Sequence, residues 1–136
     1  MPRITVLQYG AESCDELLDV TVDRVAELLD QNSVTWVNVE GLGDKNIIES
    51  LGDLFGIHGL TLEDIVNVHQ PANVDDFEHQ LFIDARMVSL EKSLDIEQIS
   101  LIVGKNFVVT FQERQGDCLE AVRARIRKGL GRIRIQ

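Results

Sequence analysis

The residues best suited to chemistry lie in one stretch of forty residues, 46–85, which contains no lysine or arginine. It holds eight carboxylates and all three histidines of the chain, which are Glu49, Asp53, Glu63, Asp64, Asp75, Asp76, Glu78, Asp84, His58, His69 and His79. Carboxylate oxygens that have no ammonium or guanidinium group beside them are the ligands that a hard divalent cation requires. Binding of a divalent cation is therefore the first chemistry that this stretch suggests.

The run Thr61-Leu62-Glu63-Asp64 also has a purely structural interpretation. It has the [ST]xx[DE] form of a capping box, which predicts that Thr61 is the N-cap of a short helix. Glu63 and Asp64, at positions N2 and N3, would then stabilise the helix N-terminus through its dipole by about 0.3 to 1 kcal/mol each, without any metal. From the residues alone we favour this cap over a metal site.

Other candidate residues are better explained by structural roles or exposure to solvent than by catalysis. Adjacent strand residues such as Asp75 and Asp76 point to opposite faces, so a solvated turn or sheet edge is favoured over a catalytic pair. His58, beside a predicted helix end, is better explained as a structural hydrogen-bonding group. The sequence contains no GxSxG, HExxH, GxGxxG or Walker motif, so we do not expect an enzyme.

Apolar periodicity predicts the elements that must position these residues. Expected strands cover residues 3–9, 16–20, 34–39, 80–90, 96–103 and 107–112, the last three as an antiparallel meander. Four helices are expected. The first begins at an N-cap on Thr21, and the second ends at Gly56 and carries on one face Ile47, Ile48, Leu51, Leu54 and Phe55. The third opens at Thr61, and the fourth runs from Asp117 as a basic amphipathic helix whose apolar face holds Leu119, Val122 and Ile126. This order predicts an α/β fold of the α+β type, with a mixed sheet and helices packed on it.

Composition excludes several classes of protein. The length of 136 residues fits one domain, 1–136, and the net charge of -10 has the wrong sign for holding a nucleic-acid backbone. The longest segment without a charged residue is ten residues, 65–74, which is too short to span a bilayer. Cys14 and Cys118 do not have the spacing of a metal-binding motif. The N-terminal residues, Met1-Pro2-Arg3-Ile4, do not begin an apolar stretch of the length that a signal peptide needs. We therefore expect free thiols and a cytoplasmic address.

Charge is unevenly distributed along the chain. Residues 1–112 carry 20 acidic and 6 basic side chains, a net charge of -14, whereas residues 113–136 carry 3 acidic and 7 basic ones, a net charge of +4. An acidic body is thus followed by a basic end.

A series of short blocks closely resembles the cytoplasmic N-terminal domain of the CorA family of divalent-cation transporters. The longest block runs from Phe55 to Gln70. Further blocks are Thr35-Trp36-Val37-Asn38-Val39-Glu40-Gly41, Leu81-Phe82-Ile83, Arg86-Met87, Glu97-Gln98-Ile99-Ser100-Leu101, Gly104-Lys105-Asn106-Phe107, Thr110-Phe111-Gln112-Glu113-Arg114, Gly116-Asp117 and Val122-Arg123-Ala124-Arg125-Ile126-Arg127. Together they cover about residues 34–134, in the order that the family has.

The resemblance implies an architecture and a location. CorA-like proteins are homopentameric magnesium channels, with cobalt and nickel as further permeant ions, in the inner (plasma) membrane. Their soluble domain is an α/β/α sandwich, a mixed and largely antiparallel sheet flanked by helices on both faces. A stalk helix and two C-terminal transmembrane helices follow it. The resemblance thus implies a domain on the cytoplasmic side, whose residues from about 130 to 136 lead toward the stalk and which meets the membrane only through helices beyond this chain.

The resemblance also implies metal ligands. In the family, Mg²⁺ binds between neighbouring cytoplasmic domains and holds the channel closed, and the matching positions here are Asp64, Glu63 and His69. Two carboxylates about 4 Å apart repel by roughly 4 kcal/mol at an effective dielectric near 20, and a divalent ion between them reverses the sign. His69 ranks last, because imidazole is a poor magnesium ligand and suits a hydrogen-bonding role or a cobalt ion better.

The sequence departs from the family pattern at one point and leaves alternatives open. After His69 and Gln70 the family usually has a basic residue, then Pro, then Lys-Val, whereas this chain has Pro71-Ala72-Asn73-Val74. That change makes the surface more acidic than is usual. One alternative is the same domain of a zinc-transporting ZntB-like relative. Another is a stand-alone cytosolic module that binds divalent cations.

Overall fold

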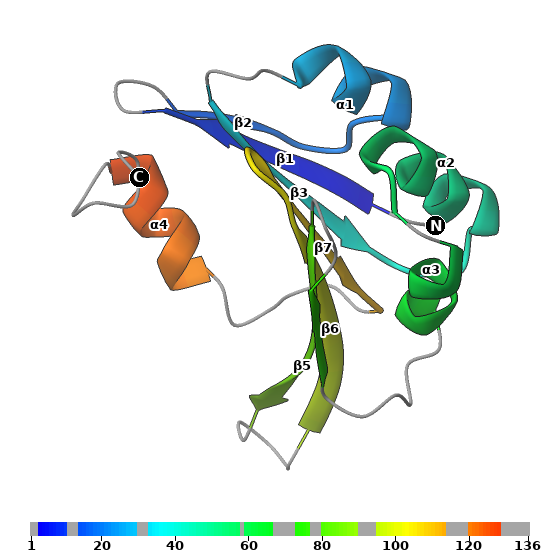
Figure 1. The fold of residues 1–136 in the computed structure, drawn as a ribbon. Coiled ribbons are helices and arrows are strands. Elements are labelled where there is room, and N and C mark those ends of the chain that lie inside the picture. Colours follow the sequence, from blue (N-terminus) through cyan, green and yellow to red (C-terminus); the bar gives the residue numbers. More distant parts are fainter. Residues whose placement is uncertain are drawn as a thin grey trace.

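A mixed sheet of seven strands forms the centre of the fold (Figure 1). The computed structural model describes residues 3–10, 14–29, 33–57, 59–66, 73–76, 80–89, 95–113 and 120–128. The strands are β1 (Arg3–Tyr9), β2 (Cys14–Leu17), β3 (Val34–Glu40), β4 (Asn73–Asp76), β5 (Leu81–Ser89), β6 (Asp95–Val103) and β7 (Phe107–Gln112). Their order across the sheet is β2-β1-β3-β7-β6-β5-β4.

Only one pair of neighbouring strands in this sheet is parallel. β3 and β7 run parallel, with Val37 opposite Val109 and Val39 opposite Phe111. The other five pairs are antiparallel. The expectation of a mixed, largely antiparallel sheet is therefore confirmed.

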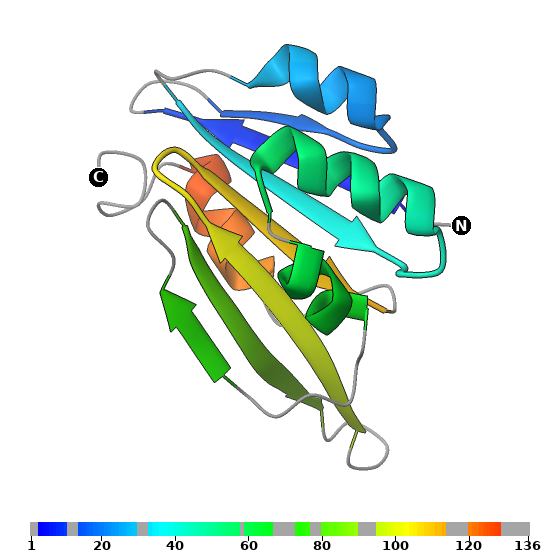
Figure 2. The same ribbon diagram turned by 45° about the vertical axis from the view of Figure 1, so that its right-hand side comes forward.

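Helices cover both faces of the sheet, as the expected α/β/α sandwich requires. The helices are α1 (Val22–Leu28), α2 (Lys45–Phe55), α3 (Gly59–Val66) and α4 (Glu120–Lys128). The first three lie on one face and α4 lies on the other (Figures 1 and 2).

The main core lies between the sheet and the α1–α3 layer. From the strands it takes buried side chains that include Val37, Val39, Phe82, Ile102, Val109 and Phe111, and from α2 it takes Ile48, Leu51 and Phe55. The ring of Phe55 also contacts that of Phe107, with the two centroids 4.8 Å apart. Strand residues at alternating positions thus meet the apolar stripe of α2 that the sequence predicts.

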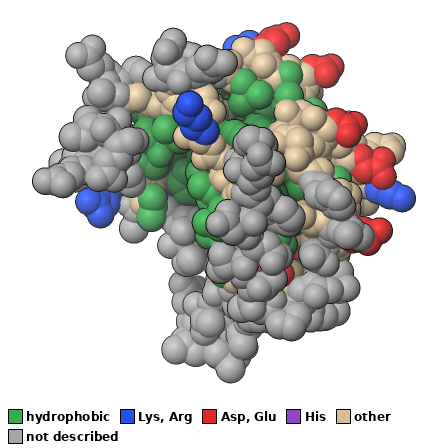
Figure 3. Space-filling view, viewed as in Figure 1, with side chains coloured by type: hydrophobic (Ala, Val, Ile, Leu, Met, Phe, Trp, Pro, Cys, Tyr) green, Lys and Arg blue, Asp and Glu red, His purple; other side chains and the backbone are tan. Residues whose placement is uncertain are grey.

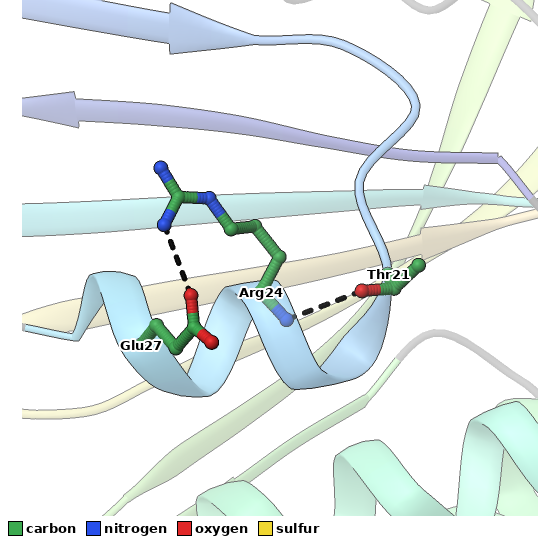
Figure 4. A network of polar contacts seen from close by, with 3 residues as sticks. All are labelled: Thr21, Arg24 and Glu27. Carbon is green, nitrogen blue, oxygen red and sulfur yellow. Dashed lines mark hydrogen bonds and ion pairs between the residues drawn. The ribbon is translucent and has the colours of Figure 1, made fainter.

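Helix α1 begins at the predicted cap. The Thr21 hydroxyl accepts a hydrogen bond from the Arg24 backbone N–H at 3.2 Å (Figure 4). The Arg24 guanidinium donates to the Glu27 carboxylate at 3.0 Å, one turn along the exposed surface. The preference of threonine for the N-cap was therefore sufficient to place this helix start.

Some expected boundaries were wrong. The second strand covers Cys14–Leu17 instead of 16–20, and β4 is an additional short strand at one edge of the sheet. Asp75 and Asp76 belong to β4, which agrees with the expectation of an edge. In α4, Ile126 is buried but Val122 is 38% exposed, so the predicted apolar face is narrower than expected, and Leu119 lies outside the described residues.

Among the described residues, few apolar side chains lie between α4 and the second face of the sheet. Ile126 packs with Leu7 and Trp36, and the Arg123 guanidinium carbon lies 4.7 Å from the centroid of the Trp36 ring. The Arg127 guanidinium makes a two-point ion pair with Glu16, at 2.8 and 3.1 Å. Attachment of α4 therefore depends on cation–π and ionic contacts as well as on burial.

Beneath α4, Thr110 links two buried polar groups. Its hydroxyl accepts a hydrogen bond from the Trp36 indole N–H at 3.1 Å and donates one to the Asn38 side-chain oxygen at 2.7 Å. We expect Thr110→Val, which keeps the shape but removes both bonds, to lower the free energy of unfolding by about 2 to 4 kcal/mol, because it leaves an indole N–H and an amide oxygen unpaired.

Urea denaturation followed by the emission of Trp36 measures this loss, since Trp36 is the only tryptophan. Thr110→Ser is the control, because it keeps the hydroxyl and should lose about 1 kcal/mol through the missing methyl group. Equal losses in the two variants would contradict the importance of the hydroxyl.

Candidate metal site

The candidate site lies on α3, which follows α2 after a sharp turn. Gly56 ends α2 in the left-handed conformation, with φ 67° and ψ 35°, which confirms the predicted C-terminal glycine. The backbone N–H groups of Gly56 and Ile57 both donate to the Gly52 carbonyl, the latter at 2.8 Å. These bonds satisfy a carbonyl at the end of α2 and fix the direction in which the chain enters α3.

Helix α3 buries one side and exposes another. Thr61 and Ile65, four residues apart, are 5% and 1% exposed. Leu62 is partly buried and packs against the main core, while Glu63 is exposed to solvent. The spacing of Thr61 and Ile65 places them on the same helix face, which holds α3 to the body of the protein.

The predicted capping box on α3 was wrong. The helix begins at Gly59, so Thr61 is its third residue and is buried, while Glu63 and Asp64 are the fifth and sixth of its eight residues. The first turn contains no acidic residue. Because the dipole effect falls off within the first turn, stabilisation of the helix N-terminus no longer explains these two carboxylates.

The structure places the other candidate residues only in part. Asp64 has a described helical backbone, and Asp75 and Asp76 have described backbones in β4. His69, which was predicted as a weaker ligand, and His58 lie outside the described residues. Glu63 is therefore the one predicted ligand whose exposure is described.

The acidic character of this side of the molecule is visible on its surface. Glu49 and Asp53 on α2 are exposed, as is Glu63 on α3, and Figure 3 shows acidic side chains along the side formed by α1 and α2. Lys45 forms an ion pair with Glu49 at 3.7 Å, one turn along α2. Residues 46–85 contain no lysine or arginine, so this stretch itself adds no such positive charge to repel a divalent ion.

The ligand atoms available here are of the type that magnesium prefers, but they are few. Within the described ranges, no three or more His, Cys, Asp or Glu side chains are grouped to hold a metal ion. Carboxylate oxygens such as that of the exposed Glu63 suit Mg²⁺, which keeps several waters and often takes only one or two protein carboxylates. On α3 the one carboxylate whose exposure is described is that of Glu63.

Sequence reasoning missed three residues that shape the molecule. Gly52 permits the close approach of α2 and α3, because a Cβ atom at this position would lie 2.5 Å from Leu62 Cδ1. The sequence suggested no partner for Arg123 or Arg127, yet they contact Trp36 and Glu16. A glycine in the middle of a strongly amphipathic helix was the one available signal for Gly52.

Comparison with known proteins identifies close relatives. The model of a family described as CorA-like Mg²⁺ transporter protein matches residues 31–135. The cobalt/magnesium transport protein CorA of Thermotoga maritima is 41% identical over 135 residues, which are 97% of this chain and 38% of that protein. The chain thus spans well under half of that relative. In the part that the structure describes, no helix has both the length and the apolar character needed to cross a membrane.

Solved structures share the fold at low sequence identity. The full-length CmaX protein superposes with a TM-score of 0.76 and 13% identity over 96% of this chain and 40% of its own. The ZntB cytoplasmic domain of Vibrio parahaemolyticus has a TM-score of 0.67 and 11% identity, over 94% of this chain and 51% of its own. At such identities the likeness concerns the fold alone.

Proposed function

The chain belongs to the family of CorA-like Mg²⁺ transporter proteins, and on that premise we propose that residues 1–136 form the cation-sensing part of a divalent-cation transporter's cytoplasmic domain. The observation that carries the proposal is 41% identity over almost the whole chain to a cobalt/magnesium transport protein. In this proposal residues 130–136 lead toward a stalk, and the membrane helices lie beyond Gln136.

The sensing role rests on the carboxylates of α3. Glu63 is exposed, and both Glu63 and Asp64 lie beyond the first turn of the helix, where the dipole gives them no structural purpose. We assign Asp64 and Glu63 as ligands of Mg²⁺ at a contact between subunits of a homopentamer, with His69 in a supporting role or as a ligand for Co²⁺. The carboxylates that complete the site come from the remainder of the full-length protein.

The physical consequence is a weak, reversible link between subunits. Without the ion, facing carboxylates repel one another and the subunits separate. With the ion, the attraction of each carboxylate for the divalent charge holds the subunits together and favours the closed channel. Because Mg²⁺ keeps most of its waters in such a site, its affinity is low enough to follow changes in the free ion concentration.

A zinc-transporting protein is the second candidate, because the fold also matches the ZntB cytoplasmic domain. The similarity to the cobalt/magnesium transporter is far higher in sequence, at 41% against 11% identity. We therefore place magnesium and cobalt ahead of zinc as the transported ions, and either transporter ahead of a stand-alone cation-binding module.

Transport by the full-length protein in vesicles tests the proposal. We expect uptake of Mg²⁺ and Co²⁺ into vesicles with a low internal Mg²⁺ concentration, and a decline of at least about tenfold when millimolar Mg²⁺ is present on the side of this domain. Vesicles without protein are the control. Uptake of Zn²⁺ alone would favour the second candidate, and no uptake of any of these ions would contradict both transporter assignments.

A further inference from the structure

Gly52 lies in the interior of α2, where glycine is unfavourable. It is the eighth of the eleven residues of the helix, and it is buried. Its φ is not positive, in contrast to that of Gly56, so the backbone conformation does not require glycine at this position. A residue that weakens the helix without a conformational reason points to a packing reason.

That packing reason is Leu62 on α3. A Cβ atom at position 52 would lie 2.5 Å from Leu62 Cδ1, 3.1 Å from Cδ2 and 3.3 Å from Cγ. Rotation about the last torsion of leucine can move Cδ1 away, but it leaves Cγ in place at 3.3 Å, so full relief needs a change at an earlier torsion or in the backbone. A methyl group on residue 52 would therefore make the Leu62 side chain leave its place or make α3 move away from α2.

Gly52 also holds the connection between the two helices. Its carbonyl accepts the N–H groups of both Gly56 and Ile57, so it fixes the turn from which α3 starts. The same residue thus sets where α3 begins and how closely α3 approaches α2. Leu62 directly precedes Glu63 and Asp64 in the chain, so any shift of the Leu62 backbone moves theirs as well.

We propose that Gly52 is a positioning residue for the cation site on α3. Its missing side chain lets Leu62 pack against α2, and this contact sets the place from which Glu63 and Asp64 reach a shared divalent cation. The proposal rests on the sensing function proposed above. It assigns to Gly52 no contact with the ion.

The test uses the full-length protein and the Mg²⁺ concentration that half-protects its cytoplasmic domain from trypsin. We expect Gly52→Ala to raise this midpoint by about tenfold, as loss of support for a metal ligand commonly does. The melting temperature should change little, because alanine favours the helix while the contact with Leu62 opposes it. Gly59→Ala is the matched control in α3, since a Cβ atom there has no neighbour within 4 Å, and its midpoint should stay unchanged.

Two further variants separate positioning from general destabilisation. Leu62→Ala opens the same contact from the other side and should also raise the midpoint, whereas adding Leu62→Ala to Gly52→Ala should bring it back to within about threefold of the unaltered protein. An unchanged midpoint in Gly52→Ala, or no recovery in the double variant, would overturn the positioning role. An unaltered protein without any Mg²⁺-dependent protection would overturn the sensing function itself.

Discussion

In the full-length protein, Asp64→Ala is expected to leave transport active at Mg²⁺ concentrations that close the unaltered protein. The substitution removes one ligand and, with it, one of the negative charges that the ion holds together, so the half-inhibiting Mg²⁺ concentration should rise by at least about tenfold. Asp64→Lys should abolish the Mg²⁺ response, because a fixed ammonium group occupies the place of the ion. Flux measured against Mg²⁺ concentration in vesicles gives both results.

Asp53→Ala is the matched control for this prediction. Asp53 is another aspartate of the stretch 46–85, and it is exposed on the neighbouring helix α2. Its loss changes the net charge by the same amount but should shift the Mg²⁺ dependence less than about twofold. If both Asp64 variants respond to Mg²⁺ as the unaltered protein does, Asp64 is not a ligand of the sensing site.

Phe111→Ala is expected to cause the largest loss of stability of any single change considered for this chain. Phe111 is 1% exposed, lies on β7 opposite Val39 of β3, and belongs to the main core. Truncation removes a buried aromatic ring and leaves a cavity, which should lower the free energy of unfolding by about 3 to 5 kcal/mol. Since domains of this kind unfold with about 5 to 15 kcal/mol in total, urea denaturation will show a much lower midpoint.

Two variants serve as controls for the loss of stability expected in Phe111→Ala. Phe111→Leu keeps most of the volume and should lose less than about 1.5 kcal/mol. Leu18→Ala changes a side chain that is 60% exposed and should alter the unfolding free energy by less than about 0.5 kcal/mol. A Phe111→Ala protein as stable as the Leu18→Ala protein would contradict the position of Phe111 in the core.

The parts of the fold that depend on local chemistry could be predicted from the sequence. The Thr21 cap, the Gly56 helix end and the apolar stripe of α2 each follow from residue preferences within one or two helical turns. The parallel pairing of β3 with β7 joins residues about seventy positions apart in the chain. No local pattern determines such a pairing, and for that reason the strand order came only with the structure.

The candidate site divides in the same way. The eight carboxylates of residues 46–85 were enough to suggest a divalent cation, and the family resemblance singled out Glu63 and Asp64, but the start of their helix was misjudged by three residues. Gly59 begins α3, and glycine is such a poor helix former that the later threonine was the more attractive start. The contact between Gly52 and Leu62 was beyond sequence reasoning, because it depends on the distance between two helices.

The single parallel pair of the sheet has a consequence for how the chain folds. β1, β2 and β3 come from residues 3–40, and β4 to β7 come from residues 73–112, so each half of the sheet is assembled from strands near one another in sequence. Bringing β3 and β7 together closes a long segment of chain, and this closure loses chain entropy before the contacts between the two strands compensate for it. The two halves should therefore form early and independently, and the seam between β3 and β7 should close last and set the folding rate.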